Sequence, residues 1–299
     1  MRIGIVGAGA IGLSFAAALG TIHDVVVFVR REEVAERLCR DGIGLAQGNE
    51  VEYVPAVASA DPRAMADRDA IVIAVKAFAT GEALAALRGI LAPNALVASV
   101  QNGIDNAADA RAALPGQRVA AGSTMYGAIK LRDGVVRPVV NAATIFARDD
   151  AAAPTSTALA AAFDAAGLAA SVVDDIAPVL WRKLIVNAVI NPLGALSRRP
   201  NGAIATDPDL AALGEELARE AGAVANAAGI ALGDPWPIAE AAARATAPNR
   251  NSMLQDLDAG RPTEIDAISG AIVRHAGRYG IAVPLTDAML RLVRARERA

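Results

Sequence analysis

A short strand followed at once by glycines at fixed spacing constrains this chain more than any other feature. The segment RIGIVGAGAIG sets Gly7, Gly9 and Gly12 in the pattern G-x-G-x-x-G, after an apolar strand and before a helix. Gly7 would allow a tight turn, Gly9 the approach of a pyrophosphate, and Gly12 close helix packing. The N–H groups at the helix start would attract the phosphates. We therefore predict a dinucleotide site at Gly7, Ala8, Gly9, Ala10, Ile11 and Gly12. The alternative is a glycine-rich turn without a ligand.

The first half of the chain alternates strand and helix signals. Apolar runs predict strands over 2–7, 24–30, 69–76 and 95–103, separated by helices over 10–20, 32–41 and 81–91. Gly42 follows the second helix and is a suitable C-cap. Strands that alternate with helices predict an α/β fold with a Rossmann-type, doubly wound parallel sheet.

The pattern changes after residue 117. Three runs predict strands that extend the sheet with antiparallel members, over 118–130, 134–140 and 143–149. A helix over 156–168 and a last strand over 169–175 follow. Beyond them the chain is mostly α-helical, with helices predicted over 176–197, 208–229, 235–247, 263–280 and 284–297. We expect a cofactor domain at 1–174 and a helical substrate domain at 175–299, with a cleft between them.

Composition excludes several classes of protein. Apolar residues make up 54% of the chain, and no apolar run is long enough and free enough of charge or glycine to predict a membrane span. The fixed glycine offsets argue against a signal peptide at the N-terminus. A net charge of −3 without a basic tract argues against nucleic acid as a partner. With one cysteine and two histidines we predict no internal disulfide and no metal site, and a cytoplasmic location.

Polar residues stand at the ends of the predicted parallel strands, where ligands bind in open α/β sheets. Arg30 ends the second strand, where an NAD enzyme usually has an acidic residue for the ribose 2′-hydroxyl. A guanidinium suits a 2′-phosphate, so we predict NADP(H). Lys76 and Asn102 follow the next two strands and reach the same edge of the sheet. The alternative for Arg30 and its neighbour Arg31 is a solvated surface charge paired with a nearby glutamate.

The predicted helix over 176–197 carries a narrow polar strip. Lys183, Asn187 and Asn191 are spaced i, i+4 and i+8, so they drift by about 80° around the axis and span about 12 Å. The neighbouring positions are apolar. Convergent polar groups in an apolar wall favour a small-molecule site, with a solvated helix face as the alternative.

A second polar segment, residues 249–266, carries Ser252 and Glu264. Composition leaves two interpretations of Glu264 open: a site residue, or a first-turn acid in a helix capped by Thr263. The histidines, His23 in a turn and His275 on a polar helix, have no nearby nucleophile and carboxylate in the sequence. We assign neither of them to catalysis.

Over essentially its whole length the sequence resembles the ketopantoate reductase family. The resemblance rests on GAGAIG, Arg30, Lys76, QNG at 101–103, RKLIVNAVINPLGAL, PNGAI, and NSMLQDLDAGRPTEID followed by YGIAVP. Many dehydrogenases share the glycine motif, whereas few pair it with the two long blocks of the second half. The resemblance implies reduction of 2-dehydropantoate to (R)-pantoate with NADPH, in pantothenate and coenzyme A biosynthesis.

The resemblance also implies roles for single residues. Lys183 would be the catalytic acid, and Glu264 would bind the substrate close to the reacting hydroxyl. Lys76 and Asn102 would lie near the nicotinamide ribose. Further substrate contacts would be made by Asn102, Asn187, Asn191 and Ser252.

Several alternatives stay open at this point. The spacing of residues does not determine the substrate, so another 2-keto acid or an imine could be reduced on the same scaffold. A non-catalytic NADP-binding regulator would use the first domain alone. The resemblance does not determine the oligomeric state, and a homodimer is one alternative.

Overall fold

The computed structural model describes residues 1–149 and 155–298. Its internal contacts divide the chain into two units. Unit 1 comprises Met1–Gln101 and Asn106–Ile176, and unit 2 comprises Asn102–Asp105 and Ala177–Ala299. The four residues Asn102–Asp105 therefore belong with the second half of the chain, although they follow directly on a strand of unit 1.

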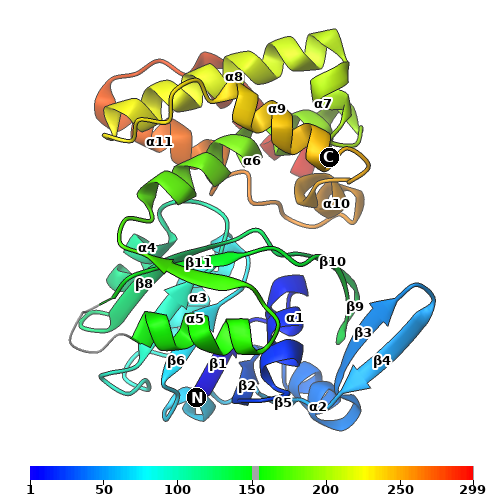
Figure 1. Ribbon diagram of the computed structural model, residues 1–299, viewed down its shortest axis with the longest axis vertical. Coiled ribbons are helices and arrows are strands. Elements are labelled where there is room, and N and C mark those ends of the chain that lie inside the picture. The colour runs from blue at the N-terminus through cyan, green and yellow to red at the C-terminus, as the bar shows by residue number, and fades with distance from the viewer. Residues whose placement is uncertain (150–154, 299) are drawn as a thin grey trace. The chain divides into compact units, whose positions relative to one another are not determined.

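Unit 1 is built on an eight-stranded sheet with the order β12-β11-β8-β7-β6-β1-β2-β5 (Figure 1). The six strands from β8 to β5 run parallel, whereas β11 pairs antiparallel with β8. Its strands are β1 (Arg2–Val6), β2 (Asp24–Phe28), β5 (Val57–Ser59), β6 (Ala70–Ile73), β7 (Leu96–Ser99), β8 (Arg118–Thr124), β11 (Thr144–Ala147) and β12 (Ala170–Val173). The predicted α/β fold with a parallel sheet is confirmed.

Helices cover both faces of this sheet. They are α1 (Ala10–Leu19), α2 (Glu32–Asp41), η1 (Pro62–Met65), η2 (Ala77–Ala79), α3 (Thr80–Ala85), α4 (Asn106–Ala113) and α5 (Thr155–Ala165). Successive strand residues point to opposite faces, so Val25 and Val27 join the core beneath α1, α2 and α5, while Val26 and Phe28 join the core beneath α3 and α4. The helix predicted over 81–91 is shorter, because the chain leaves α3 after Ala85 and reaches a positive φ at Gly89.

Unit 1 also contains a second sheet that the sequence patterns do not predict. Its order is β4-β3-β10-β9. The strands are β3 (Ile43–Gln47), β4 (Glu50–Val54), β9 (Gly127–Arg132) and β10 (Val135–Val140). The prediction of one strand over 118–130 is wrong, because β8 ends at Thr124 and β9 belongs to the other sheet. The prediction that 134–140 extends the main sheet is wrong for the same reason. The Gly48–Asn49 pair between β3 and β4 is a hairpin signal that could have revealed these two strands.

Unit 2 is helical throughout its described part. Its helices are α6 (Ala177–Ser197), α7 (Ala203–Thr206), α8 (Pro208–Ala227), α9 (Trp236–Ala245), α10 (Ser252–Asp258), α11 (Ser269–Tyr279) and α12 (Pro284–Glu297). The mostly helical second half is confirmed, although α7 and α10 are not predicted from the sequence. The helix predicted over 263–280 begins too early, because residues 265–268 form turns and α11 starts at Ser269.

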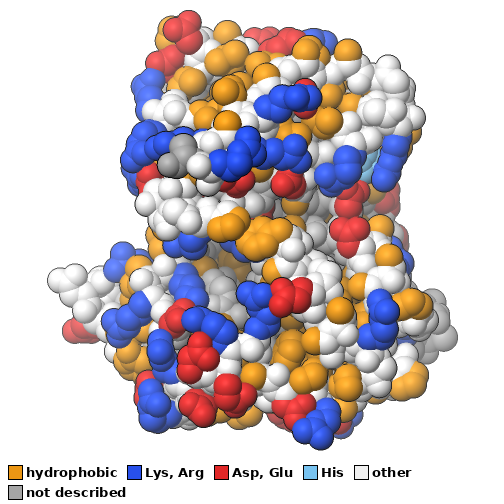
Figure 2. All heavy atoms as spheres, turned by 180° about the vertical axis from the view of Figure 1, so that it is seen from behind, with side chains coloured by type: hydrophobic (Ala, Val, Ile, Leu, Met, Phe, Trp, Pro, Cys, Tyr) orange, Lys and Arg blue, Asp and Glu red, His pale blue; other side chains and the backbone are white. Residues whose placement is uncertain are grey.

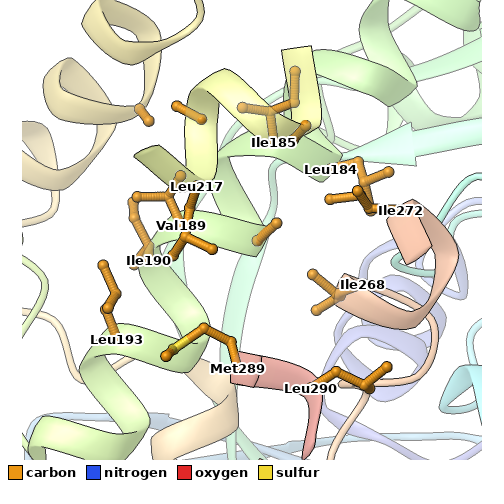
Figure 3. Packing of buried hydrophobic residues seen from close by; sticks show 14 of the residues in the cluster. Leu184, Ile185, Val189, Ile190, Leu193, Leu217, Ile268, Ile272, Met289 and Leu290 are labelled. Atoms are coloured by element: carbon orange, nitrogen blue, oxygen red, sulfur yellow. The ribbon is translucent and has the colours of Figure 1, made fainter. Parts of the chain in front are cut away.

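Helix α6 forms the core of unit 2. Its residues Leu184, Ile185 and Val189 pack with Leu217 of α8 and Ile272 of α11 (Figure 3). By length and composition α6 could cross a membrane, with a mean hydropathy of 1.2, but 61% of that apolar window is buried inside the protein. It is therefore the buried core helix of unit 2.

On the face drawn in Figure 2, acidic side chains lie among the basic ones.

Candidate active site

The glycine loop between β1 and α1 has the form of a phosphate cradle. Gly7 has a φ of +114°, and a Cβ there would lie 2.7 Å from Cγ1 of Val75. A Cβ on Gly12 would lie 2.1 Å from the backbone oxygen of Gly7, so the fold itself requires glycine at both positions. Gly9 differs, because a Cβ there would meet only the Ala74 oxygen at 3.7 Å. Glycine at this position leaves the backbone open to a ligand.

The start of α1 suits an anion as well. Gly9 is the N-cap residue and has no side chain with which to cap the first N–H groups of this helix. Ala8, Ala10 and Ile11 are half-buried. Unpaired N–H groups and the helix dipole favour negative charge at such a terminus. The loop therefore fits the pyrophosphate of a dinucleotide.

Arg30 and Arg31 follow β2, and each forms an exposed ion pair. Nη1 of Arg30 lies 2.6 Å from Oε2 of Glu82, with both side chains about two-thirds exposed. Nη2 of Arg31 lies 2.9 Å from Asp133, and its Nη1 lies 3.5 Å from Glu33. Arg31 is thus a paired surface charge, as the alternative interpretation predicts. The partner of Arg30 on α3 was not anticipated.

Gln101, to which the sequence assigned no role, holds the chain after β6. Gln101 is buried, and its Nε2 donates to the Val75 oxygen at 2.8 Å and to Oγ1 of Thr80 at 2.6 Å. These bonds tie Gln101 to one residue on each side of half-buried Lys76. An amide just after the fully buried strand β7 was the available signal, since a buried amide needs partners.

The polar strip of α6 is not a solvated helix face. Lys183 and Asn187 are half-buried, and Asn191 is buried with an exposure of 5%. The helix turns its larger apolar residues into the core of unit 2 and leaves one polar edge. Of the two interpretations of this strip, the structure excludes the solvated face.

A chain of hydrogen bonds joins this strip to distant residues of unit 2. Nδ2 of Asn102 donates to Oε2 of Glu264 at 2.9 Å, and Nδ2 of Asn187 donates to Oδ1 of Asn102 at 3.4 Å. Glu264 is only 7% exposed, and it lies in a bend before α11 rather than in a first helical turn. The interpretation of Glu264 as an acid in the first turn of a helix is therefore wrong. Its carboxylate is directed to Asn102.

The electrostatic environment of Lys183 is unusual for a lysine. Burial lowers the pKa of Lys183 from 10.5 to about 8, although the charge of Glu264 acts to raise it. The effect of burial is the larger one, because the ammonium loses more stabilisation by water than it gains from the negative charge of one carboxylate. A lysine with this pKa can both carry a positive charge and release a proton near neutral pH.

Ser252 lies at the first position of α10, where Asn251 is the N-cap residue. Oδ1 of Asn251 accepts from the Leu254 N–H, and its Nδ2 donates to the Ile190 oxygen of α6. Ser252 itself is exposed. The structure thus attaches the start of α10 to α6, the helix that carries Lys183.

The structure gives His275 a partner that the sequence could not show. Nε2 of His275 lies 2.8 Å from Oδ1 of Asp105, which is 170 positions away in the chain. His23, by contrast, lies in the turn before β2 as expected. Within residues 1–149 and 155–298, no three His, Cys, Asp or Glu side chains are grouped so as to hold a metal ion.

Comparison with protein families gives two matches that together cover most of the chain. A model described as "Ketopantoate reductase PanE/ApbA" matches residues 3–150, and one described as "Ketopantoate reductase PanE/ApbA C terminal" matches residues 175–297. A 2-dehydropantoate 2-reductase of Halobacterium salinarum is 33% identical and covers 100% of this chain and 99% of the relative. The Bacillus subtilis 2-dehydropantoate 2-reductase is 32% identical, with 100% and 98% covered.

Solved structures are similar over the same length. A ketopantoate reductase of the PanE/ApbA family from Ralstonia eutropha superimposes with a TM-score of 0.90 at 32% identity, covering 100% of this chain and 99% of the other. A D-mandelate dehydrogenase in complex with NADH superimposes with a TM-score of 0.87 at 25% identity, covering 100% and 99%. The similarity therefore extends to enzymes named for different substrates.

Proposed function

The chain belongs to the ketopantoate reductase family of nicotinamide-dependent enzymes, and we propose that it reduces 2-dehydropantoate to (R)-pantoate with NADPH. The observation that carries this proposal is the environment of Lys183. A lysine with a pKa of about 8 shares unit 2 with the hydrogen-bonded side chains Asn102, Asn187 and Glu264. This combination supplies both the acid and the polar contacts that reduction of a keto acid needs.

The chemistry that unit 2 would perform follows from these residues. NADPH, when bound, would supply a hydride to the C2 carbonyl carbon. Negative charge then develops on the carbonyl oxygen, and Nζ of Lys183 donates a hydrogen bond and finally its proton to that oxygen. Lys183 is left neutral and regains a proton from solvent. The oxygen ends as the new hydroxyl group.

The other polar groups of unit 2 would hold the substrate and orient one another. The amide nitrogen of Asn102 donates to Glu264, and its amide oxygen accepts from Asn187. The charge of Glu264 also acts to keep Lys183 protonated. Amide and hydroxyl groups suit a carboxylate and a hydroxyl, so we assign further substrate contacts to Asn102, Asn187, Asn191 and Ser252.

In unit 1 the glycine loop would hold the pyrophosphate, and Arg30 would bind the 2′-phosphate of NADPH. The exposed Arg30–Glu82 pair is weakly held, so a phosphate can take over the guanidinium. The choice of NADPH needs a test of its own, because a D-mandelate dehydrogenase of similar structure was solved with NADH.

We expect Arg30→Ala to lower kcat/KM for NADPH about 30-fold and to leave kcat/KM for NADH within about twofold, because only NADPH carries the 2′-phosphate. Steady-state kinetics with both cofactors and a saturating keto acid measures the preference. Arg31→Ala is the matched control, since Arg31 is equally exposed and already has two carboxylate neighbours. An unchanged preference in Arg30→Ala would remove Arg30 from the cofactor site.

We expect the rate of reduction to fall as pH rises through about 8, the pKa of Lys183. Below this pH the ammonium is present and can donate its proton, whereas above it the neutral amine cannot. kcat/KM for the keto acid should therefore be level below about pH 7 and decline about tenfold per pH unit above about pH 9. The reverse oxidation of the alcohol should rise over the same range. A profile that stays level to pH 10 would contradict the assignment.

The substrate can be decided with a panel of 2-keto acids. We expect 2-dehydropantoate to have a kcat/KM at least about tenfold above those of pyruvate, 2-ketoisovalerate and benzoylformate. The oxidation of NADPH measures the rate with each keto acid. Preference for benzoylformate would favour a relative of the mandelate type. Binding of NADPH without turnover of any keto acid would favour a regulator.

We further propose that the protein acts in pantothenate biosynthesis in the cytoplasm, where the free thiol of Cys39 would stay reduced.

A further inference from the structure

The carboxylate of Asp105 is held by two adjacent residues of α11. Nε2 of His275 lies 2.8 Å from Oδ1, and Nη2 of Arg274 donates to Oδ2 at 2.8 Å. The side chains of Asp105 and His275 are 24% and 14% exposed, while that of Arg274 is 48% exposed. Each carboxylate oxygen thus has its own donor. A pair of bonds of this kind fixes the orientation of the carboxylate as well as its position.

The two neighbours of Asp105 favour its ionised form. Burial alone would raise the pKa of Asp105, but the bonds from His275 and Arg274 outweigh it and hold this pKa below its usual value. Within the described part of the chain, the buried Nδ1 of His275 has no hydrogen-bond partner. Because Nε2 faces a carboxylate oxygen at 2.8 Å, Nε2 is the ring nitrogen that donates to Asp105.

Asp105 lies at one end of the four-residue segment Asn102–Asp105, and Asn102 lies at the other end. Between them Gly103 has a φ of +105°, and Ile104 packs against the core of unit 2. The segment is therefore fixed to unit 2 at three places: at Asn102 through Glu264, at Ile104, and at Asp105. Because the segment is only four residues long, a displacement of Asp105 also displaces Asn102.

His275 also contacts the helix that carries the predicted acid. Its ring packs edge-on against Trp181, with centroids 5.6 Å apart and planes at 84°. Trp181 is buried on α6, two residues before Lys183. One imidazole thus contacts both the segment that holds Asn102 and the helix that holds Lys183.

We propose that Asp105, His275 and Arg274 form an anchor whose task is to position Asn102 against Glu264 and Asn187. None of the three is a catalytic residue, because they act on the substrate only through Asn102. This inference rests on the proposed function, in which Asn102 contacts the substrate. It gives His275, which lies in the sequence like an ordinary surface residue of a helix, a role in the reaction.

A double-mutant cycle separates this anchor from a general effect on stability. We expect Asp105→Ala to lower kcat/KM for the keto acid about 30-fold, because a displacement of about 1 Å at a binding group has effects of this size. In a protein that already carries Asn102→Ala, the same change should lower kcat/KM less than about threefold, since the group that it positions is absent. An equal loss in both backgrounds would overturn the proposal. Asp287→Ala, which removes an exposed ion pair on α12, is the control and should leave kcat/KM unchanged.

A second pair of variants tests the hydrogen bond from His275. His275→Leu removes the donor, whereas His275→Gln provides an N–H at about the position of Nε2. We expect the Leu variant to lose activity like Asp105→Ala and the Gln variant to keep at least about one third of the wild-type kcat/KM. Equal losses in both, at a temperature where both are folded by circular dichroism, would contradict an anchor based on this bond.

Hydrogen exchange tests the anchor independently of the activity. We expect amide exchange in a peptide that covers 102–105 to be at least about tenfold faster in His275→Leu than in the wild-type protein, with no change in a peptide from α8. Unchanged exchange over 102–105 would overturn the anchor even if the enzyme reduces keto acids. Faster exchange in a protein without such activity would leave the anchor standing and remove the proposed function.

Discussion

Lys183→Met is expected to lower kcat for reduction of 2-dehydropantoate about 1,000-fold. The substitution keeps an apolar stem of similar length and removes only the ammonium, so the core around α6 is conserved. Two contributions are lost together: transfer of a proton to the carbonyl oxygen, and stabilisation of the charge that develops there. KM should change little, because these interactions are made mainly in the transition state.

The control for this change is Lys130→Met. Lys130 lies in β9, is about one-third exposed and pairs with Asp133, so its replacement should leave kcat unchanged. The decline of kcat/KM above pH 8 should also disappear in Lys183→Met, because the titrating group is gone. A kcat within about threefold of wild type would remove Lys183 from the acid role.

Gly12→Ala and Gly9→Ala are expected to fail in different ways. A Cβ on Gly12 would lie 2.1 Å from the backbone oxygen of Gly7, which cannot move without displacing β1 or α1. We expect a loss of about 3 kcal/mol in the free energy of unfolding. Gly9 has φ −81° and ψ −179°, which alanine adopts readily, and a Cβ there would have only one ordinary contact. The free energy of unfolding of Gly9→Ala should therefore lie within about 1 kcal/mol of the wild-type value.

Binding separates the two glycines further. A methyl group on Gly9 would occupy the place where a pyrophosphate approaches the backbone, so we expect NADPH to bind at least about 30-fold more weakly to a fully folded Gly9→Ala protein. Denaturant unfolding and titration of NADPH fluorescence measure the two quantities. Wild-type binding by Gly9→Ala would show that the loop is a structural turn only.

The architecture could be predicted where local signals are strong. The mainly apolar, fully buried strands β6 and β7 and the glycine loop before α1 have sequence patterns that few other structures share. The second sheet escaped prediction because it joins β3 and β4 to β9 and β10, about 80 residues further along the chain. Nothing local distinguishes a strand that extends one sheet from a strand that begins another.

For the candidate site, the sequence indicated which residues to consider but could not predict the contacts between them. The spacing of Lys183, Asn187 and Asn191 predicts one edge of a helix, and the structure contains that edge. The state of Glu264 could not be predicted, because residues 263–266 fit a helix start equally well. Only packing of the segment before α11 buries its carboxylate and brings it within 2.9 Å of Asn102.

The sequence by itself determined the α/β class, the glycine loop, the helical second half and the polar edge of α6, because each depends on residues close together in the chain. The tertiary structure alone decided that Asn102 meets Glu264, 162 positions away, and that Asp105 meets His275, 170 positions away. It also decided that Lys183 loses enough water for its pKa to fall to about 8. Hydrogen bonds between distant residues and the desolvation of a charge arise only when separate elements pack, and no local pattern encodes them.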